Sequence, residues 1–351
     1  MSENRPSFII TIDTEGDDLW SRPRLVTTRN AEFLLPFQEL CESFGLRPTY
    51  LTNHEMALTP AFIDLGRNAV WRGVAEIGMH LHAWDSPPHV PLTDDDVGHH
   101  PYLTEYPVTV MRDKVRAQTR LLEDVFGVPI RSHRAGRWSL DERYAGILIE
   151  EGYVVDCSVT PHVSWRANKG DPRGNGGADY IAFPEAPYFI DPLDIRRPGS
   201  SPLLEVPVTV MRQPRSWRVA ERLLSASPSR SLFSRALGRL MPPIRWLRPN
   251  GRNRADLLDI VHAVVSAGRS HAEFMLHSSE LMPGGSPTFR DHKAIDRLYG
   301  DLRAVFALAA RTCRPATLTE FHTWLTTGRI AEWPLASSNA ASALYGRALP
   351  A

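Results

Sequence analysis

The chain alternates short apolar segments with longer amphipathic ones, and this alternation limits the possible folds more than any other feature. The short segments are typical of buried strands, and the long ones place apolar residues at helical spacing. The predicted strands span residues 7–14, 47–52, 75–84, 129–135, 153–159, 203–210 and 273–276. The predicted helices span residues 30–44, 59–72, 109–126, 139–151, 254–267 and 290–311. Because parallel strands need a crossover connection, this order predicts an α/β barrel or an open α/β sheet.

Several predicted helices have typical start and stop residues. Asn30 is expected to cap the first helix, and Thr59 the second, with Pro60 at its first helical position. Ser139 begins an S-x-x-E capping box. Gly127 is expected to end the long helix before it. These residues place the helix boundaries independently of the apolar pattern.

Charge and cysteine content exclude several classes of protein. Lysine plus arginine and aspartate plus glutamate each number 40, so the net charge indicates no particular partner. The three cysteines, Cys41, Cys157 and Cys313, are far apart and form no CxxC pair, which argues against a disulfide framework or a thiolate zinc site. We see neither a secretory signal pattern nor an apolar stretch of about 18 residues, as a membrane span needs. We therefore expect a cytoplasmic protein.

Residues 212–254 are strongly basic in an otherwise neutral chain. They contain eleven arginines and a single acidic residue, Glu221, and several of their apolar residues fall at helical spacing. Such a segment can lie on an anionic membrane surface or face a phosphorylated ligand. It can equally be a helical insertion with a solvated arginine face. Nucleic acid is not an expected partner, because no RNA-stacking motif or zinc finger is present.

Two stretches offer metal-ligand side chains. In EIGMHLHAW, His80 and His82 point to the same side of a strand, so both imidazoles can reach one ion, although two core histidines would fit the same pattern. In FIITIDTEGDDLW, Asp13 and Glu15 also share a face at a strand end. Histidine and carboxylate together form the mixed shell that zinc and other divalent metals accept.

The acids that follow Glu15 have a simpler interpretation. Asp17 and Asp18 lie beyond the predicted strand and are expected to be solvated. An acid inside the apolar run, as Asp13 is, is not explained in this way.

Two further strand ends carry polar side chains. RSHRAGRW contains Arg134, Arg137 and Trp138, and an arginine beside a carboxylate keeps it ionised and oriented. In EFMLHSSEL, His277 ends an apolar strand and could donate a proton to a leaving group. Four predicted parallel strands thus carry polar residues at their C-terminal ends, where barrels and open α/β sheets place active sites.

The order and character of these four stretches resemble the polysaccharide deacetylase family, the NodB-homology carbohydrate esterases. More narrowly, they resemble its subgroup associated with lipopolysaccharide biosynthesis. The similarity runs from about residue 7 to about residue 325. It implies a distorted (β/α)7-type barrel over residues 1–327, with 212–254 as a basic, partly helical insertion. Residues 328–351 are then an Ala/Ser-rich tail.

The resemblance also implies roles for single residues. Asp13 would be the catalytic base, Arg134 its orienting arginine and His277 the proton donor. Glu15, His80 and His82 would hold one divalent ion, which we expect to be zinc. Expected substrate contacts are Trp84, Arg137, Trp138 and Glu280, and Trp20 is a further residue that could stack on a sugar.

The sequence departs from the commoner family pattern at three points. Thr14 separates the two acids, which leaves open whether Asp13 or Glu15 is the metal ligand. The second histidine follows the first by two residues, with Trp84 at the position four residues on, so loop histidines remain reserve donors. These reserve donors are His89, His99 and His100. Arg137 takes a place where proline is usual, and it could contact an anionic substrate group.

The function implied is metal-dependent removal of an N-acyl group, most simply N-acetyl, from an amino-sugar precursor of a surface polysaccharide. A nucleotide-linked or polyprenyl-phosphate-linked sugar would suit residues 212–254, which could also contact the inner membrane surface. Two alternatives remain. One is a non-catalytic sugar-binding protein of the same fold, and the other is a deformylase or related amide hydrolase.

Overall fold

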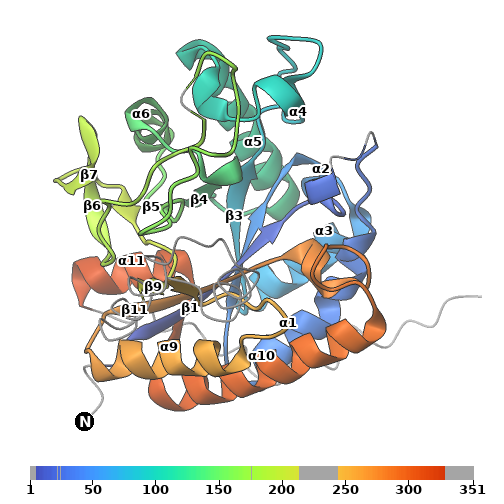
Figure 1. Cartoon of the computed structure of the whole chain (residues 1–351), viewed down its shortest axis with the longest axis vertical. Coiled ribbons are helices and arrows are strands. Elements are labelled where there is room, and N and C mark those ends of the chain that lie inside the picture. The colour runs from blue at the N-terminus through green and yellow to red at the C-terminus, as the bar shows by residue number, and fades with distance from the viewer. Residues whose placement is uncertain (1–4, 22, 24, 175, 213–243, 329–351) are drawn as a thin grey trace, which may run out of the picture.

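Parallel strands form the centre of the molecule in the computed structural model, which describes residues 5–21, 23, 25–174, 176–212 and 244–328 (Figure 1). Within this part of the chain, seven parallel strands lie in the order β11-β1-β2-β3-β4-β5-β8. Their bounds are β1 Ser7–Thr14, β2 Pro48–Thr52, β3 Glu76–Leu81, β4 Ser132–Ala135, β5 Val155–Asp156, β8 Leu204–Glu205 and β11 His271–His277. The short strand β12 (Arg314–Ala316) also pairs with β1 in parallel.

The edge beyond β8 is antiparallel. The hairpin β6 (Tyr188–Asp191) and β7 (Asp194–Pro198) joins the sheet there through β6. A separate two-stranded ribbon pairs β9 (Val210–Arg212) with β10 (Ile244–Trp246). The periodicity did not predict β6, β7 or β12, because these strands are short and partly exposed.

The sheet curls back on itself through the segment that follows β8. The Val208 amide donates to the Val159 carbonyl (3.0 Å), and the Thr209 amide donates to the Glu273 carbonyl on β11 (3.4 Å). The Glu273 amide in turn donates to the Thr209 hydroxyl (2.8 Å). Leu247 donates to the Thr209 carbonyl (2.9 Å). These bonds link the two ends of the parallel run and close a distorted barrel.

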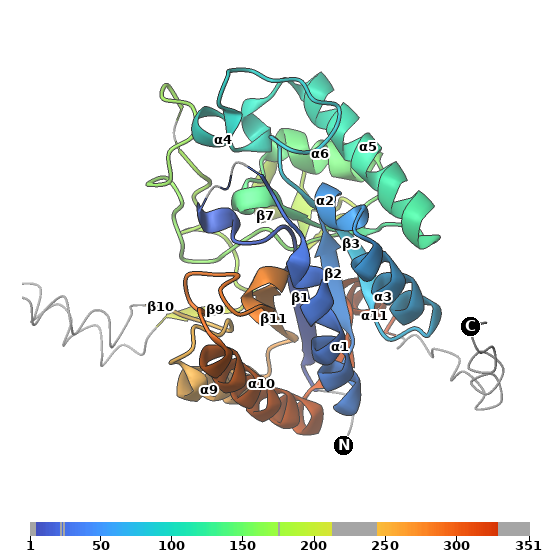
Figure 2. The same ribbon diagram turned by 90° about the vertical axis from the view of Figure 1, so that its right-hand side faces the viewer.

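Helices cover the outside of this barrel. Their bounds are α1 Leu34–Ser43, α2 His54–Ala57, α3 Pro60–Trp71, α4 Asp96–His99, α5 Val108–Phe126, α6 Glu142–Glu150, α9 Arg254–Ser266, α10 His292–Thr312 and α11 Leu318–Thr327. Helices α1, α3 and α5 lie along the outer side of the first strands (Figure 2). Helices α9 and α10 pack on each other beside β11 (Figure 1), and α10 also contacts β12. With helices outside and side chains filling the interior, all eight residues of β1 are buried.

The predicted α/β barrel class is confirmed, and most predicted elements lie close to their observed bounds. Strand β1 matches its prediction exactly in range, and α3 has Pro60 at its first turn. Helix α5 ends at Gly127, whose φ of 69° is left-handed and favours glycine.

Two cap predictions are wrong. Asn30 lies inside a short 3-10 helix (Arg29–Phe33), and its side chain bonds the loop after β1 instead of a helix end. Helix α6 is capped by Asp141, which accepts a hydrogen bond from the Tyr144 amide, whereas the Ser139 hydroxyl contacts that of Thr104. Asn30 and Ser139 each form a hydrogen bond with a distant segment, and neither side chain caps the helix that the local pattern predicts.

The basic segment is described only at its two ends. Residues 213–243 lie outside the described residues, as do residues 329–351 of the Ala/Ser-rich tail. At the described end, Arg245 lies 3.6 Å from Asp256, and Arg248 pairs with Glu280 (3.1 Å). In the described part of the chain, no helix is both long and apolar enough to cross a membrane.

Candidate metal and catalytic site

The C-terminal ends of β1, β3, β4 and β11 bring the predicted site residues together. Asp13 on β1 is the register partner of His277 on β11, and His80 on β3 is the partner of Arg134 on β4. A cavity of about 420 Å³ opens at these ends. Its lining includes Asp13, Glu15, Trp20, His80, His82, Trp84, Arg137, Trp138, Trp165, Arg248 and His277. The volume is in the range of small-molecule sites.

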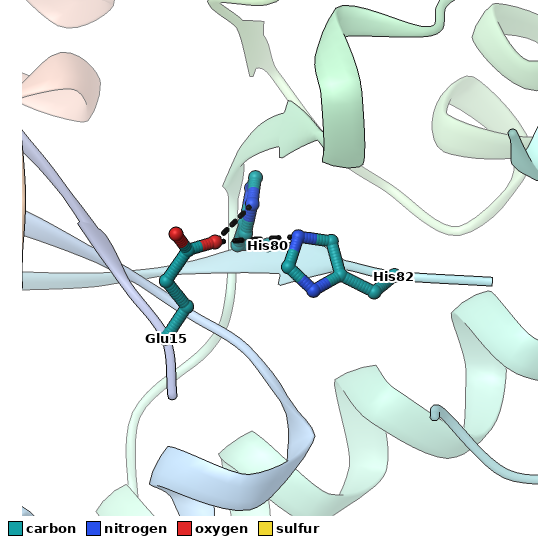
Figure 3. A group of neighbouring side chains, drawn as sticks. All are labelled: Glu15, His80 and His82. Carbon is teal, nitrogen blue, oxygen red and sulfur yellow. Dashed lines mark ion pairs between the residues drawn. The ribbon is translucent and has the colours of Figure 1, made fainter. Parts of the chain in front are cut away.

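Glu15, His80 and His82 form a buried group with the composition of a metal site (Figure 3). Oε2 of Glu15 lies 3.5 Å from Nε2 of His80 and 3.3 Å from Nε2 of His82. The imidazole of His80 comes from β3, that of His82 from the residue just after it, and the carboxylate from the loop after β1 (Figure 3). The acid in this group is Glu15, and Asp13 is not part of it. Among the described residues, no loop histidine joins it either.

The hydrogen bonding of His80 fits a metal ligand. Its Nδ1 lies 2.9 Å from the carbonyl oxygen of Arg134, which can only accept, so Nδ1 carries the proton. Nε2 is then the ring nitrogen that faces Glu15 and that an ion could bind. Such a second hydrogen bond is typical of metal-bound histidine. Burial would raise the pKa of Glu15, but His277, His80 and His82 hold it well below its ordinary value, so the carboxylate is ionised.

Asp13 and Arg134 form a buried ion pair in the barrel interior. Nη1 of Arg134 donates to Oδ1 of Asp13 (2.6 Å). The remaining donors go to the Thr11 hydroxyl (2.9 Å), the Cys157 carbonyl (3.1 Å) and the Glu273 carboxylate. Burial would raise the pKa of Asp13, but Arg134 and the neighbouring histidines lower it. Asp13 is thus ionised, and Arg134 fixes one of its oxygens.

His277 faces the same carboxylates from the other side. Its Nε2 lies 3.6 Å from Oδ2 of Asp13 and 3.8 Å from Oε1 of Glu15. Its Nδ1 lies 3.0 Å from an Arg248 nitrogen and 3.3 Å from Glu280. The ring is therefore held at Nδ1 and presents Nε2 to the cavity.

Glu280 does not line the cavity as a predicted substrate contact should. Its side chain is buried, accepts a hydrogen bond from the His277 amide (2.9 Å) and pairs with Arg248. Burial would raise the pKa of Glu280, but Arg248 and His277 lower it to about 2. The structure places this carboxylate behind His277, where it orients the imidazole.

The aromatic residues near the site pack mainly on site side chains. Trp84 stacks on His82 with ring centres 4.4 Å apart, and the Arg137 guanidinium lies 5.0 Å from the Trp84 ring centre. The Arg134 guanidinium lies 5.0 Å from the centre of Trp138, which is 9% exposed. Trp20 is 41% exposed and meets His277 edge-on. Of the three tryptophans, Trp20 has the most exposed ring.

The expectation that Asp17 is solvated is wrong. Asp17 is buried, and its carboxylate accepts hydrogen bonds from the amides of Arg29 and Asn30 and from the Thr27 hydroxyl. The Asn30 side chain bonds both Asp17 (2.7 Å) and the Glu15 carbonyl (2.9 Å). The loop after β1 is folded around this carboxylate, which helps to place Glu15.

Sequence reasoning missed four polar residues next to the site. Glu273 is an acid within a buried strand, which is a signal the sequence does carry. Glu55, Asp85 and Arg248 come from loops and helix starts that only the fold brings to the site. Burial and Asp85 raise the pKa of Glu55 to about 8.

Comparison with known proteins identifies the fold. No family model matches the sequence, and no curated protein sequence does. Among solved structures, a "putative polysaccharide deacetylase" from Mycobacterium smegmatis superposes with a TM-score of 0.51, at 13% identity over 93% of both chains. A 4-alpha-glucanotransferase from Thermococcus litoralis gives 0.52 at 14% identity, over 92% of this chain and 40% of that one.

The chain shares its fold with these two proteins. Their names describe different activities, so the likeness at this identity shows the fold and not the reaction. The Xyl-CE4 domain of a multidomain xylanase from the hindgut metagenome of Trinervitermes trinervoides also matches, at 9% identity over 93% of this chain and 92% of that one. Its TM-score of 0.42 is too low to support an argument.

Proposed function

We propose that the protein is a metal-dependent amide hydrolase of the polysaccharide deacetylase type, which removes an N-acyl group from an amino sugar. The observation that carries the proposal is the joint placement of three groups in one cavity. These are the Glu15–His80–His82 cluster, the Asp13–Arg134 pair and His277. A sugar-binding protein needs neither an oriented base nor a second proton carrier.

The ligand set favours zinc as the divalent ion. Two imidazole nitrogens and one carboxylate are a common catalytic zinc set, which leaves a further position open for water or substrate. A bound ion would supply Lewis-acid polarisation of the amide carbonyl. The fixed tautomer of His80 and the ionised Glu15 are the features of this chain that suit such an ion.

Asp13 is the proposed general base. Arg134 occupies its Oδ1, so Oδ2 is the oxygen available to take a proton from the attacking water. The lowered pKa of Asp13 keeps this carboxylate in its basic form across neutral pH. Positioned general bases typically contribute a factor of about 10²–10⁴ in rate.

His277 is the proposed general acid. Its Nε2 faces the cavity 3.6 Å from Asp13, so one bound substrate can lie against both groups. The amine product is a poor leaving group as an anion, and a proton delivered by Nε2 solves that problem. As the acid, the ring is an imidazolium that donates its Nδ1 proton to Glu280, and Arg248 pairs with the same carboxylate.

An anionic amino-sugar precursor is the proposed substrate class. Arg137 and Arg248 both line the cavity, and guanidinium groups suit phosphate or carboxylate. A nucleotide-linked or lipid-phosphate-linked sugar of surface polysaccharide synthesis would supply such a group. A cytoplasmic location, with residues 212–254 at the inner membrane surface, completes this proposal. Deletion of residues 213–243 should then weaken binding to anionic vesicles.

Metal content is the first test of the proposal. Elemental mass spectrometry on the wild type, His80→Ala and His82→Ala should give about one divalent ion per wild-type chain and loss in both variants. A panel of N-acetyl and N-formyl amino sugars, scored for acetate or formate release, then identifies the acyl group. Asp13→Asn should keep the metal and lose about 10²-fold or more in turnover. A wild type that holds no ion after supplementation would favour a binding protein.

A further inference from the structure

A second pair of carboxyl groups lies directly behind the metal cluster. Oδ2 of Asp85 is 3.8 Å from Nδ1 of His82, on the side of the ring away from the nitrogen that faces Glu15. Glu55 stands next to Asp85, and the ligand atoms of Glu55, His82 and Asp85 lie within 4.8 Å of one another. Two segments distant in sequence, the start of α2 and the loop after β3, thus meet behind one imidazole.

Glu55 also reaches the backbone that carries Glu15. Its Oε1 accepts hydrogen bonds from the Gly16 amide (3.1 Å) and from the Asn53 side chain (2.5 Å). Gly16 makes this approach possible, because a Cβ there would come within 3.0 Å of the same Oε1 and 2.2 Å of Val26. The Glu55 carboxyl therefore contacts the backbone next to Glu15, and it also lies beside Asp85, the residue behind His82.

Several atoms of this cluster are left without a hydrogen bond. Among the described residues, Nδ1 of His82, Oδ2 of Asp85 and Oε2 of Glu55 are buried and have no hydrogen-bond partner. His82 itself is only 4% exposed. Buried polar atoms of this kind normally have partners. The nearest candidates for Nδ1 of His82 and Oδ2 of Asp85 are each other, 3.8 Å apart.

A second cation between these atoms is a poor alternative. An ion on Nδ1 of His82, with another on Nε2, would require the ring to give up both of its N–H protons. A proton on Nδ1 needs no such change and leaves Nε2 free as a ligand. Asp85 then has the role that carboxylates commonly play behind metal-bound histidine.

We propose that Asp85 and Glu55 form a positioning pair. Asp85 accepts the Nδ1 proton of His82, which leaves Nε2 as the metal ligand, and Glu55 holds Asp85 in place. Through the Gly16 amide, Glu55 ties this support to the segment that carries Glu15. The inference rests on the proposed metal site, and it assigns roles to two residues that do not touch the ion.

Metal affinity measured by chelator competition tests the pair without any substrate. Asp85→Asn and Glu55→Ala should each weaken zinc binding about 10–100-fold, the usual effect of losing such a partner. Asp96→Asn is the matched control, since Asp96 begins α4 in the segment after β3 and its carboxylate accepts hydrogen bonds from Leu92, Thr93 and Tyr106. Its affinity should equal that of the wild type.

The visible spectrum of the cobalt-loaded protein shows whether the effect reaches the ligands themselves. The spectrum should change in Asp85→Asn but not in Asp96→Asn. Unchanged affinity in Asp85→Asn, with binding lost in His82→Ala, overturns the inference and leaves the metal site intact. Two ions in the wild type and one in Asp85→Asn would overturn it in favour of a second site. Retained binding in His82→Ala would instead contradict the proposed function.

Discussion

Arg134 lies between two carboxylates in the interior of the barrel. It pairs with Asp13 at the cavity floor and with Glu273 on β11, and it is fully buried. Burial raises the pKa of Glu273 to about 7 even with Arg134 beside it. One guanidinium therefore compensates two acids, of which only Asp13 reaches the cavity.

Replacing Arg134 by methionine should destabilise the fold strongly. The change leaves Asp13 and Glu273 buried without their cation, and breaking a buried pair in this way costs about 3–5 kcal/mol. Urea unfolding of the metal-free protein measures the loss. Arg196→Met is the control, since Arg196 pairs with Asp194 at the surface, and the unfolding free energy of this variant should stay close to that of the wild type. Equal effects of the two changes would contradict a supporting role for Arg134.

At the level of single residues, the sequence predicts the site correctly where residue spacing along a strand determines which way a side chain points. His80 and His82 share a side because strand residues alternate, and their nitrogens do converge on Glu15. Asp17 was assigned to solvent because its partner, Asn30, is thirteen residues away in a loop. No local pattern encodes that contact.

At the level of elements, apolar periodicity predicted strands and long helices well, and cap residues less well. A helix begins where a side-chain oxygen accepts from its free amides, and both Ser139 and Asp141 carry a suitable side chain. The fold decided among them, because Ser139 is drawn to Thr104 in a neighbouring segment. Asp141 is then the residue whose carboxylate reaches the Tyr144 amide.

The cap of α6 can be tested directly. Asp141→Ala removes the acceptor of the Tyr144 amide and should lower the unfolding free energy by about 1 kcal/mol, as is usual for a lost N-cap. Glu142→Gln is the contrasting change, because Glu142 is exposed and acts only through its charge near the helix start, worth about 0.3–1 kcal/mol. Chemical denaturation of both variants at low ionic strength compares them. A larger loss in Glu142→Gln would restore the S-x-x-E interpretation.

At the scale of the whole molecule, the barrel depends on the seam between β11 and the segment after β8. His271, at the start of β11, donates from Nε2 to the Pro207 carbonyl (3.0 Å), just before Thr209 and Glu273 exchange their bonds. Its Nδ1 is buried with no hydrogen-bond partner among the described residues. The side chain is thus fitted to the neutral imidazole, and a proton on Nδ1 would be a buried, unsatisfied charge.

The seam should therefore weaken in acid. Burial lowers the pKa of His271 from 6.5 to about 4, with Arg269 adding to the effect. Because the unfolded chain takes up this proton first, the stabilisation is complete above pH 6.5 and is lost as the pH falls from 6.5 toward 4. Since a tenfold change in proton affinity corresponds to about 1.4 kcal/mol, the full loss is about 3 kcal/mol.

His271→Gln separates this effect from the titration of the site carboxylates. Glutamine can donate to the Pro207 carbonyl but does not titrate, so all other acid effects remain in the variant. Between pH 7 and pH 4.5, the unfolding free energy of the metal-free wild type should fall by about 2–3 kcal/mol more than that of the metal-free variant. The two curves should run parallel above pH 7, where both side chains are neutral. Parallel curves throughout would mean that the acid sensitivity of the barrel arises elsewhere than at its seam.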